Sequence, residues 1–188
     1  MTSAFDLESF KRRLRREDLA SESDESRPVA AVAIIINPND RGGSILLIKR
    51  TEREGDPWSG QVAFPGGHKA SKDRDFLATA LREAREEVGI DLRGHELVGQ
   101  LPLVHARTHR VQVAPYVFQL KTSVAVQSNN EVAESFWIPL DTLGRIDVRR
   151  TEVSVEEGKL EVDAYVYDGN VIWGLTFRII NILLDRKT

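Results

Sequence analysis

Residues 66–90 read GGHKASKDRDFLATALREAREEVGI, a glycine-rich turn followed by a segment with helical spacing. At about 3.6 residues per turn, the apolar side chains of the second part fall on one stripe, and three glutamates fall on roughly the opposite side. The segment predicts a helix that is buried along one face, anionic along the other, and ended by Gly89. The stripe comprises Leu77, Ala80, Leu81, Ala84 and Val88, and the acidic side comprises Glu83, Glu86 and Glu87.

The acidic side of this helix is a candidate metal site. Glutamates spaced by three or four residues repel one another when they are solvated, by roughly a few tenths of a kcal/mol per pair, and a bound cation offsets that repulsion. Oxygen-only ligands favour Mg²⁺ or Mn²⁺. The alternative is a solvated helix face on which Arg82 and Arg85 pair with the glutamates. The glycines at both ends of the segment favour the metal site.

The same segment resembles the Nudix box, in which a glycine is followed at fixed distances by an acidic residue, and then by an Arg-Glu pair, a Glu-Glu pair and a glycine. Residues 82–90 fit the second half of this pattern. Counting from Gly67, the acidic position falls on Asp73, where the family usually has Glu. The spacer that follows is one residue longer than usual, and Ala84 is smaller than the usual aliphatic residue. The resemblance extends over most of the chain, from residues 64–67 to residues 136–140.

The resemblance implies an α/β (α+β) fold, a Nudix-like α/β/α sandwich with a mixed β-sheet between helices. Glu86 and Glu87 are the first predicted metal ligands, and the family adds the carbonyl of the box glycine, here Gly67. Glu83 is predicted to bind a metal-held water or to deprotonate it. Arg82 is predicted to fix a glutamate through a bidentate contact, and a surface salt bridge is the alternative.

The general base is sought outside the box, because Nudix enzymes differ in where it comes from. Glu131 lies in the loop of residues 129–134 and matches a position from which some relatives supply a further carboxylate. Its alternative is a solvated loop glutamate. Asp73 is read either as part of the outer metal shell or as a helix N-cap.

The substrate is predicted from a second resemblance. Residues 46–50 with residues 60–67, and later residues 172–176, resemble the coenzyme A pyrophosphatase branch of the family. Three positions depart from the pattern of that branch. Thr51 replaces the usual Ser or Ala, and the spacer within this upstream motif is one residue longer. The expected arginine is absent from its place, and Arg53 is a displaced candidate for it. Arg50 and Arg53 are predicted to contact substrate phosphates, with solvated loop charges as the alternative.

Trp58 and one loop that contains two histidines also allow more than one interpretation. Trp58 can stack on a base, although an aromatic residue beside proline is more often a packing anchor. His105, His109 and Arg110 fall in one loop. With four histidines and no cysteine in the chain, we read this loop as surface or substrate edge and not as a transition-metal site.

The predicted reaction is hydrolysis of a pyrophosphate bond in a nucleoside diphosphate linked to another moiety, with coenzyme A or a similar adenylate-containing diphosphate as substrate. ADP-ribose, dinucleoside polyphosphates and nucleoside triphosphates are the alternatives. A rival from another class is a catalytically inactive module that binds nucleotide and regulates a partner. The density of like charge argues against that rival, because a binding module does not need it.

Length and composition limit the remaining choices. The chain has 188 residues, 41% of them hydrophobic, which suits a single catalytic domain over residues 28–188 behind an N-terminal amphipathic helix and polar linker in residues 1–27. A net charge of −3 argues against nucleic acid as a partner. Without cysteine there is no disulfide, thiolate nucleophile or zinc cluster. With no membrane-length apolar run or signal peptide, we expect a cytoplasmic protein with a small-molecule substrate, and we keep a homodimer as one option.

Apolar periodicity predicts the other elements. The run 29–36 should be a strand buried on both sides and paired in a hairpin with residues 44–49. Pro115 should break the strand predicted over residues 111–120. Further elements are a helix over residues 6–18, strands over residues 61–64, 96–103 and 135–138, a hairpin of residues 152–155 with 159–167 turning at 156–158, and a closing helix over residues 173–184 that starts with a core tryptophan, Trp173.

Overall fold

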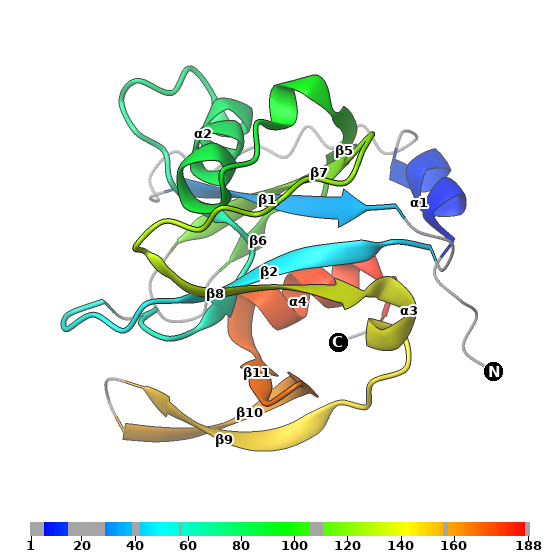
Figure 1. The fold of residues 1–188 in the computed structure, drawn as a ribbon. Helices are drawn as coiled ribbons and strands as arrows, with labels where there is room; N and C mark the ends of the chain where they lie inside the picture. The colour runs from blue at the N-terminus through cyan, green and yellow to red at the C-terminus, as the bar shows by residue number, and fades with distance from the viewer. Residues whose placement is uncertain are drawn as a thin grey trace.

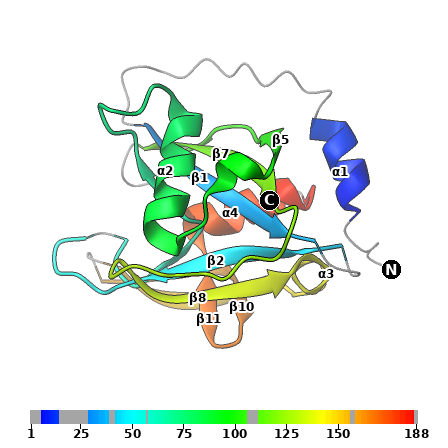
Figure 2. The same cartoon turned by 45° about the horizontal axis from the view of Figure 1, so that its top comes forward.

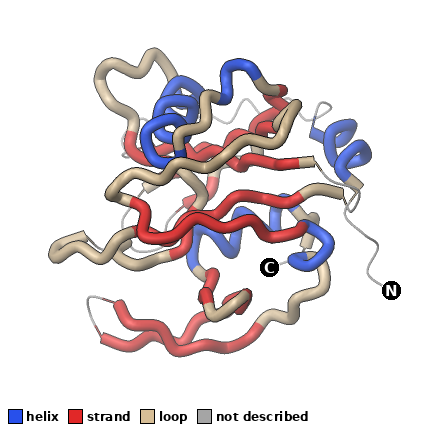
Figure 3. Tube along the Cα trace, in the orientation of Figure 1, coloured by secondary structure: helices blue, strands red, loops and turns tan. Residues whose placement is uncertain are grey.

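The computed structural model describes residues 6–14, 29–38, 42–56, 58–105, 111–155 and 158–186 (Figures 1 and 3). Its helices are α1 (Leu7–Leu14), α2 (Phe76–Val88), α3 (Leu140–Leu143) and α4 (Gly174–Leu183), with a short 3-10 helix at Leu92–Gly94. Its strands are β1 (Val29–Asn37), β2 (Ser44–Arg50), β3 (Val62–Ala63), β4 (Gly66–His68), β5 (Glu96–Gln100), β6 (Val104–His105), β7 (Gln112–Gln119), β8 (Val132–Pro139), β9 (Arg149–Val155), β10 (Gly158–Tyr167) and β11 (Asn170–Ile172).

The main sheet runs β3-β2-β1-β7-β5, with β4 beside β1, β6 beside β7 and β8 beside β2. Strands β1 and β7 are parallel, whereas the other pairs are antiparallel, so the predicted mixed sheet is confirmed. The predicted hairpin of β1 and β2 is confirmed as well, but it is short: Ile36 faces Ile45 and Asn37 faces Ser44. Towards its start, β1 pairs instead with β4, which brings the glycine turn into the sheet.

Strand β1 is buried on both faces, as its apolar run predicts. Its alternate residues Ala31, Ala33 and Ile35 belong to a core that includes the apolar side of α2. Ile34 and Ile36 belong to a second core on the other face, with side chains from α1 and α4. Figure 2 shows α2 and α4 on opposite sides of β1 and β2, which confirms the predicted sandwich of helices around a mixed sheet.

Strand β7 continues through Pro115, so the predicted break is wrong. The Pro115 carbonyl accepts a hydrogen bond from the Leu101 N–H at 2.9 Å, on the side where β5 ends and β6 has not yet begun. Because the N–H and C=O of one strand residue point to the same side, the donor that proline lacks falls in this gap. The parallel ladder with β1 on the other side is intact, and Pro115 faces Val32 there.

A second sheet follows the main one in the chain, with the order β11-β10-β9. It confirms the predicted hairpin, in which Gly158 faces Val155, although Glu156 and Glu157 of the predicted turn lie outside the described residues. The predicted closing helix is confirmed as α4. Trp173 precedes this helix and is only half-buried, so its predicted place in the core is wrong.

The N-terminal helix is present as α1, shorter than the predicted range of residues 6–18 because residues 15–18 and the linker of residues 20–27 lie outside the described part. Phe10 and Leu14 are buried against the core, and the Lys11 ammonium lies 3.0 Å from the Glu96 carboxylate at the start of β5. Among the described helices, none is long and apolar enough to cross a membrane.

Candidate active site

Helix α2 carries the acidic segment and has a cap at each end. At its start the Asp75 carboxylate accepts a hydrogen bond from the Ala78 N–H at 2.7 Å. At its end Gly89 takes a left-handed conformation with φ of 71°, which favours glycine. The predicted C-terminal stop is therefore confirmed. The N-cap is Asp75, so the reading of Asp73 as the N-cap is wrong.

The glycine turn packs closely against the backbone of β1 and against the Glu83 side chain of the acidic helix. A Cβ atom at Gly66 would lie 2.4 Å from the Ala31 carbonyl oxygen, and one at Gly67 would lie 2.5 Å from Oε1 of Glu83. Both distances are far below van der Waals contact. The two glycines therefore bring the backbone of β4 directly beside the Glu83 carboxylate.

Asp73 lies buried against α2, with 6% of its surface exposed. Its carboxylate accepts two hydrogen bonds from the Arg82 guanidinium, at 3.0 Å from Nε and 2.9 Å from Nη2, and others from the Thr79 hydroxyl and the Ala70 N–H. The bond with Arg82 is the main reason why the pKa of the Asp73 carboxyl lies well below its usual value. Asp73 is thus the residue that orients Arg82.

Arg82 spreads its remaining contacts over the acidic side of α2. Its Nη1 lies 2.7 Å from the Glu83 carboxylate and 2.8 Å from that of Glu86, and its Nη2 donates to the His68 carbonyl at 3.2 Å. The bidentate partner is Asp73, whereas the sequence predicted that a glutamate would take that place. Arg82 therefore connects the glycine turn to two of the three glutamates.

Glu87 differs from the other two glutamates because it is buried, with 2% of its surface exposed. The prediction that the buried and the anionic residues fall on separate faces of the helix is therefore wrong for this residue. Its Oε2 accepts a hydrogen bond from the Gly66 N–H at 2.8 Å, and its Oε1 lies 3.9 Å from Nη1 of Arg50. Burial is the largest cause that raises the pKa of the Glu87 carboxyl to about 7, and the charge of Glu83 contributes.

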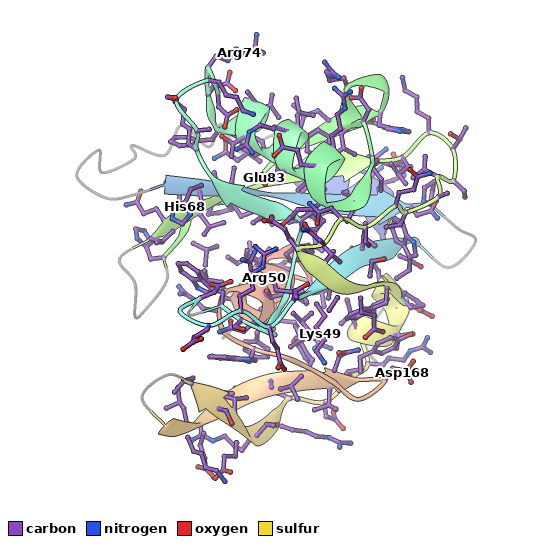
Figure 4. The ribbon with its side chains drawn as sticks, turned by 60° about the vertical axis from the view of Figure 1, so that its left-hand side comes forward. Lys49, Arg50, His68, Arg74, Glu83 and Asp168 are labelled. Atoms are coloured by element: carbon purple, nitrogen blue, oxygen red, sulfur yellow. The ribbon has the colours of Figure 1, made fainter. Side chains whose placement is uncertain are left out.

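Arg50 is the last residue of β2 and reaches into the same region. Its Nη2 donates to the Asp56 carboxylate at 2.8 Å, which holds the guanidinium against the loop between β2 and β3. Its Nε is buried and has no hydrogen-bond partner within the described chain. Figure 4 shows Arg50 and Glu83 in the middle of the molecule, while Arg74 and Asp168 lie far out towards opposite ends.

The predicted general base and the second predicted substrate arginine contact each other. Nη1 of Arg53 lies 3.1 Å from the Glu131 carboxylate, and both side chains are more than two-fifths exposed. Two hydrogen bonds join the same loops, from the Thr51 N–H to the Glu131 carbonyl at 2.9 Å and from the Thr51 hydroxyl to the Asn130 carbonyl at 3.0 Å. The loop after β2 and the loop before β8 are therefore tied together at the edge of the site.

The residues predicted as metal ligands supply the chemistry that Mg²⁺ or Mn²⁺ requires, because all their donor atoms are oxygens. Burial is the largest cause that raises the pKa of the Glu83 carboxyl, and the charge of Glu86 also raises it, so these carboxylates already repel one another. The donor set fits a divalent cation. Within the described ranges, however, no three His, Cys, Asp or Glu side chains converge as a preformed metal group, and arginines lie among the glutamates instead.

The remaining candidates lie at the margin or outside the described chain. Trp58 packs against the core beside β3, with its ring centroid 6.1 Å from that of His68. The His105 carbonyl accepts a hydrogen bond from Arg178 in α4, and His109 and Arg110 lie outside the described residues. Sequence reasoning missed Asp56, since an acidic residue in a polar loop carries no signal of the arginine that it will hold.

Comparisons with known proteins identify the family. The family model described as the NUDIX domain matches residues 26–156. An uncharacterized Nudix hydrolase, NudL, from Photorhabdus laumondii is 37% identical over 167 residues, and the match covers 87% of each chain. The NudL protein of Pectobacterium atrosepticum is 32% identical, with 95% of this chain and 93% of the relative covered.

Solved structures show the same fold. A MutT/nudix family protein from Enterococcus faecalis superposes with a TM-score of 0.55 at 18% identity, over 95% of this chain and 68% of that one. A C. elegans Ap4A hydrolase binary complex gives a TM-score of 0.51 at 20% identity, over 62% and 82% of the two chains. Since the domain match spans more than half of the sequence and the acidic helix with its glycine turn lies inside it, the chain belongs to the Nudix hydrolase family.

Proposed function

We propose that the protein hydrolyses the pyrophosphate bond of a nucleoside diphosphate linked to another group, with Mg²⁺ or Mn²⁺ as its cofactor. The observation that carries this proposal is the buried Glu87 carboxylate, which is held by the Gly66 N–H and lies beside the other glutamates of α2. A carboxylate without water around it is costly unless a cation or hydrogen bonds compensate for its charge. A divalent cation would meet that need.

The proposed roles follow from the positions of the side chains. Glu86, Glu87, Glu83 and the Gly67 carbonyl would hold the cation, which when bound neutralises phosphate oxygens and acidifies the attacking water. Arg82, oriented by Asp73, would keep Glu83 and Glu86 in place. Glu131 is proposed as the general base, with Glu83 as the second candidate.

The preferred substrate is proposed to be coenzyme A or a similar adenylate-containing diphosphate. The support is the sequence pattern of residues 46–50 and 60–67, together with two arginines in the intervening segment. Arg50 and Arg53 already lie beside carboxylates, at Glu87 and Glu131, and would contact the substrate phosphates from these places. ADP-ribose, dinucleoside polyphosphates and nucleoside triphosphates are the alternative substrates of the same chemistry.

The test is product analysis of the purified protein, with Mg²⁺ or Mn²⁺, against coenzyme A, ADP-ribose, NADH, diadenosine polyphosphates and nucleoside triphosphates. Release of a phosphopantetheine product from coenzyme A alone supports the narrow substrate. Cleavage of other members of the panel would support pyrophosphate hydrolysis but contradict specificity for coenzyme A. If no member of the panel is cleaved with either metal, the result favours a substrate outside the panel or a module that binds nucleotide without turnover.

The metal assignment is tested by Glu87→Gln. We expect turnover to fall by at least about a hundredfold, because even residues that only support a metal ligand cost about 10- to 100-fold when they are replaced. The fold should persist, since glutamine keeps an oxygen that can accept from the Gly66 N–H. Glu54→Gln is the matched control, at an exposed glutamate of the loop after β2. Equal activity of Glu87→Gln and the parent would contradict the assignment.

A further inference from the structure

Arg50 contacts two carboxylates that differ in their surroundings. Its Nη2 donates to Asp56 at 2.8 Å, whereas its Nη1 lies 3.9 Å from Oε1 of Glu87, beyond hydrogen-bond distance. Asp56 is therefore the anchor of the guanidinium. The contact with Glu87 is an electrostatic attraction without a hydrogen bond. Breaking this contact therefore costs Arg50 no hydrogen bond.

Glu87 depends on this neighbour for charge compensation. Its side chain is almost fully buried, and Arg50 is the cationic side chain paired with it in the part of the chain that the structure describes. Arg82 of α2 pairs with Asp73, Glu83 and Glu86 instead. A buried carboxylate and a cation at such a separation attract each other more strongly than they would in water.

We propose that Arg50 is an exchangeable counter-ion of Glu87, so that Arg50 and a divalent cation compete for this carboxylate. The inference rests on the proposed function, since it assumes that the cation binds at the glutamates of α2. Asp56, which accepts a hydrogen bond from Arg50, would keep the guanidinium on the β2–β3 loop if a cation replaced it at Glu87. From that position Arg50 would be available to pair with a phosphate of the substrate.

Two substitutions should shift cation affinity in opposite directions. Arg50→Met removes the competing charge, so the protein should bind Mn²⁺ more tightly, by about tenfold for a unit charge near the site. Asp56→Asn removes the anchor's charge and leaves the full charge of Arg50 facing Glu87, so Mn²⁺ should bind more weakly. The asparagine keeps a side-chain oxygen that can accept a hydrogen bond from the Trp58 N–H, as Oδ1 of Asp56 does at 3.0 Å. Arg50→Lys, which keeps the charge, should remain close to the parent.

The experiment is calorimetric titration of the full chain with Mn²⁺ in mildly alkaline buffer without nucleotide, with free Mn²⁺ counted by electron paramagnetic resonance. Thermal unfolding confirms that each variant is folded. The matched controls are Arg150→Met, at an exposed arginine of β9, and Asp168→Asn, at an exposed turn far from Arg50. Both should bind Mn²⁺ as the parent does.

Opposite shifts for Arg50→Met and Asp56→Asn support the exchange. If the parent binds Mn²⁺ and both variants bind it with the same affinity, Arg50 is no counter-ion of the site and the inference is overturned, while the proposed function stands. If Arg50→Met does not fold, Arg50→Gln takes its place, because it also removes the charge and can still donate to Asp56, and the same tighter binding of Mn²⁺ is expected. If neither the parent nor Arg50→Met binds Mn²⁺, the metal assignment fails and the exchange fails with it.

Discussion

Asp73 is the carboxylate on which the geometry of the acidic helix depends. It is one carbon shorter than the glutamate usual at this place in the Nudix box, and the spacer that follows it is one residue longer. It nevertheless reaches Arg82 with two hydrogen bonds from a buried position. Arg82 in turn contacts Glu83 and Glu86. The orientation of two proposed ligands thus depends on one buried ion pair.

Asp73→Asn should destabilise the protein by about 1.5–3 kcal/mol, because it weakens the charge-assisted hydrogen bonds that join Arg82 to the buried Asp73 carboxylate. Urea unfolding monitored by circular dichroism measures this change. Asp75→Asn is the matched control, since asparagine caps a helix about as well as aspartate. Equal effects of the two substitutions would contradict the buried role of Asp73.

The stability difference between parent and Asp73→Asn should also depend on pH. The pKa of this carboxyl is lower in the folded protein than in the unfolded chain, chiefly because of the bond from Arg82, so the unfolded state takes up its proton first as the pH falls. The contribution is therefore complete above the ordinary carboxyl pKa and is lost as the pH falls towards the folded value. Unfolding free energies of both proteins across the acidic range measure it. A constant difference would show that the shift is absent.

Substitutions of Glu131 and Arg53, which form one ion pair, distinguish the proposed role of Glu131 as general base from the proposed role of Arg53 in substrate binding. Glu131→Gln should lower kcat by about a hundredfold or more, the usual scale for loss of a general base. Arg53→Met breaks the same ion pair but keeps the carboxylate, so it should act mainly on KM. Steady-state kinetics on the best substrate of the panel measure both. An unchanged kcat in Glu131→Gln would move the role to Glu83.

Among the elements, α1 shows how a segment outside the family pattern is joined to the fold. Phe10 and Leu14 are buried, and Leu14 lies over the backbone of β5, where a Cβ atom at Gly99 would come within 2.7 Å of its Cδ2. The Lys11 ammonium is nearly buried beside Glu96. Helix α1 therefore closes one core of its own chain.

Leu14→Ala should cost about 3 kcal/mol of unfolding free energy, because it removes a buried side chain over a glycine that cannot fill the space. Chemical denaturation gives the value. Arg12→Ala is the control, as Arg12 is exposed on the same helix and a substitution there should stay within about 0.5 kcal/mol. If Leu14→Ala behaves like its control, α1 does not contribute to the stability of the core.

The molecule as a whole consists of the main sheet with a core on each face and the second sheet packed beside one of them. Tyr165 of β10 joins these parts. Its buried hydroxyl donates to the Asn181 side-chain oxygen of α4 at 2.7 Å and accepts from Arg186 at 2.9 Å. Arg186 also donates to the carbonyls of Gly144 and Ile146, in the segment between α3 and β9. The second sheet, the closing helix and the chain between the two sheets meet at this hydroxyl.

Tyr165→Phe should destabilise the protein by about 1–3 kcal/mol, since it leaves the buried Asn181 side-chain oxygen without its donor from Tyr165 while it keeps the ring. Thermal unfolding measures the loss. Tyr167→Phe on the same strand is the control, because Tyr167 is half-buried and its hydroxyl makes no hydrogen bond to the described residues. Catalysis should be little affected in either variant. A loss of turnover in Tyr165→Phe without a loss of stability would contradict its structural role.

Local patterns explain why much of the fold could be predicted. The spacing in residues 66–90 predicts α2 and its end at Gly89, and the apolar run predicts β1 as a strand buried on both faces. Trp173 shows the limit of such patterns, because the apolar stripe of α4 continues into a residue that precedes the helix and is only half-buried. Periodicity reports which residues face inward, and it does not report where the chain leaves a helix.

The sequence by itself determined the family, the acidic helix with its end at Gly89, the mixed sheet between helices and the oxygen-rich character of the site, because each is set by local spacing and side-chain chemistry. Only the tertiary structure decided that Glu87 is buried, that Asp73 orients Arg82 and that Arg50 lies beside Glu87. These depend on segments far apart in the chain that pack together. Desolvation and charge pairing change with such packing, so no local pattern encodes them.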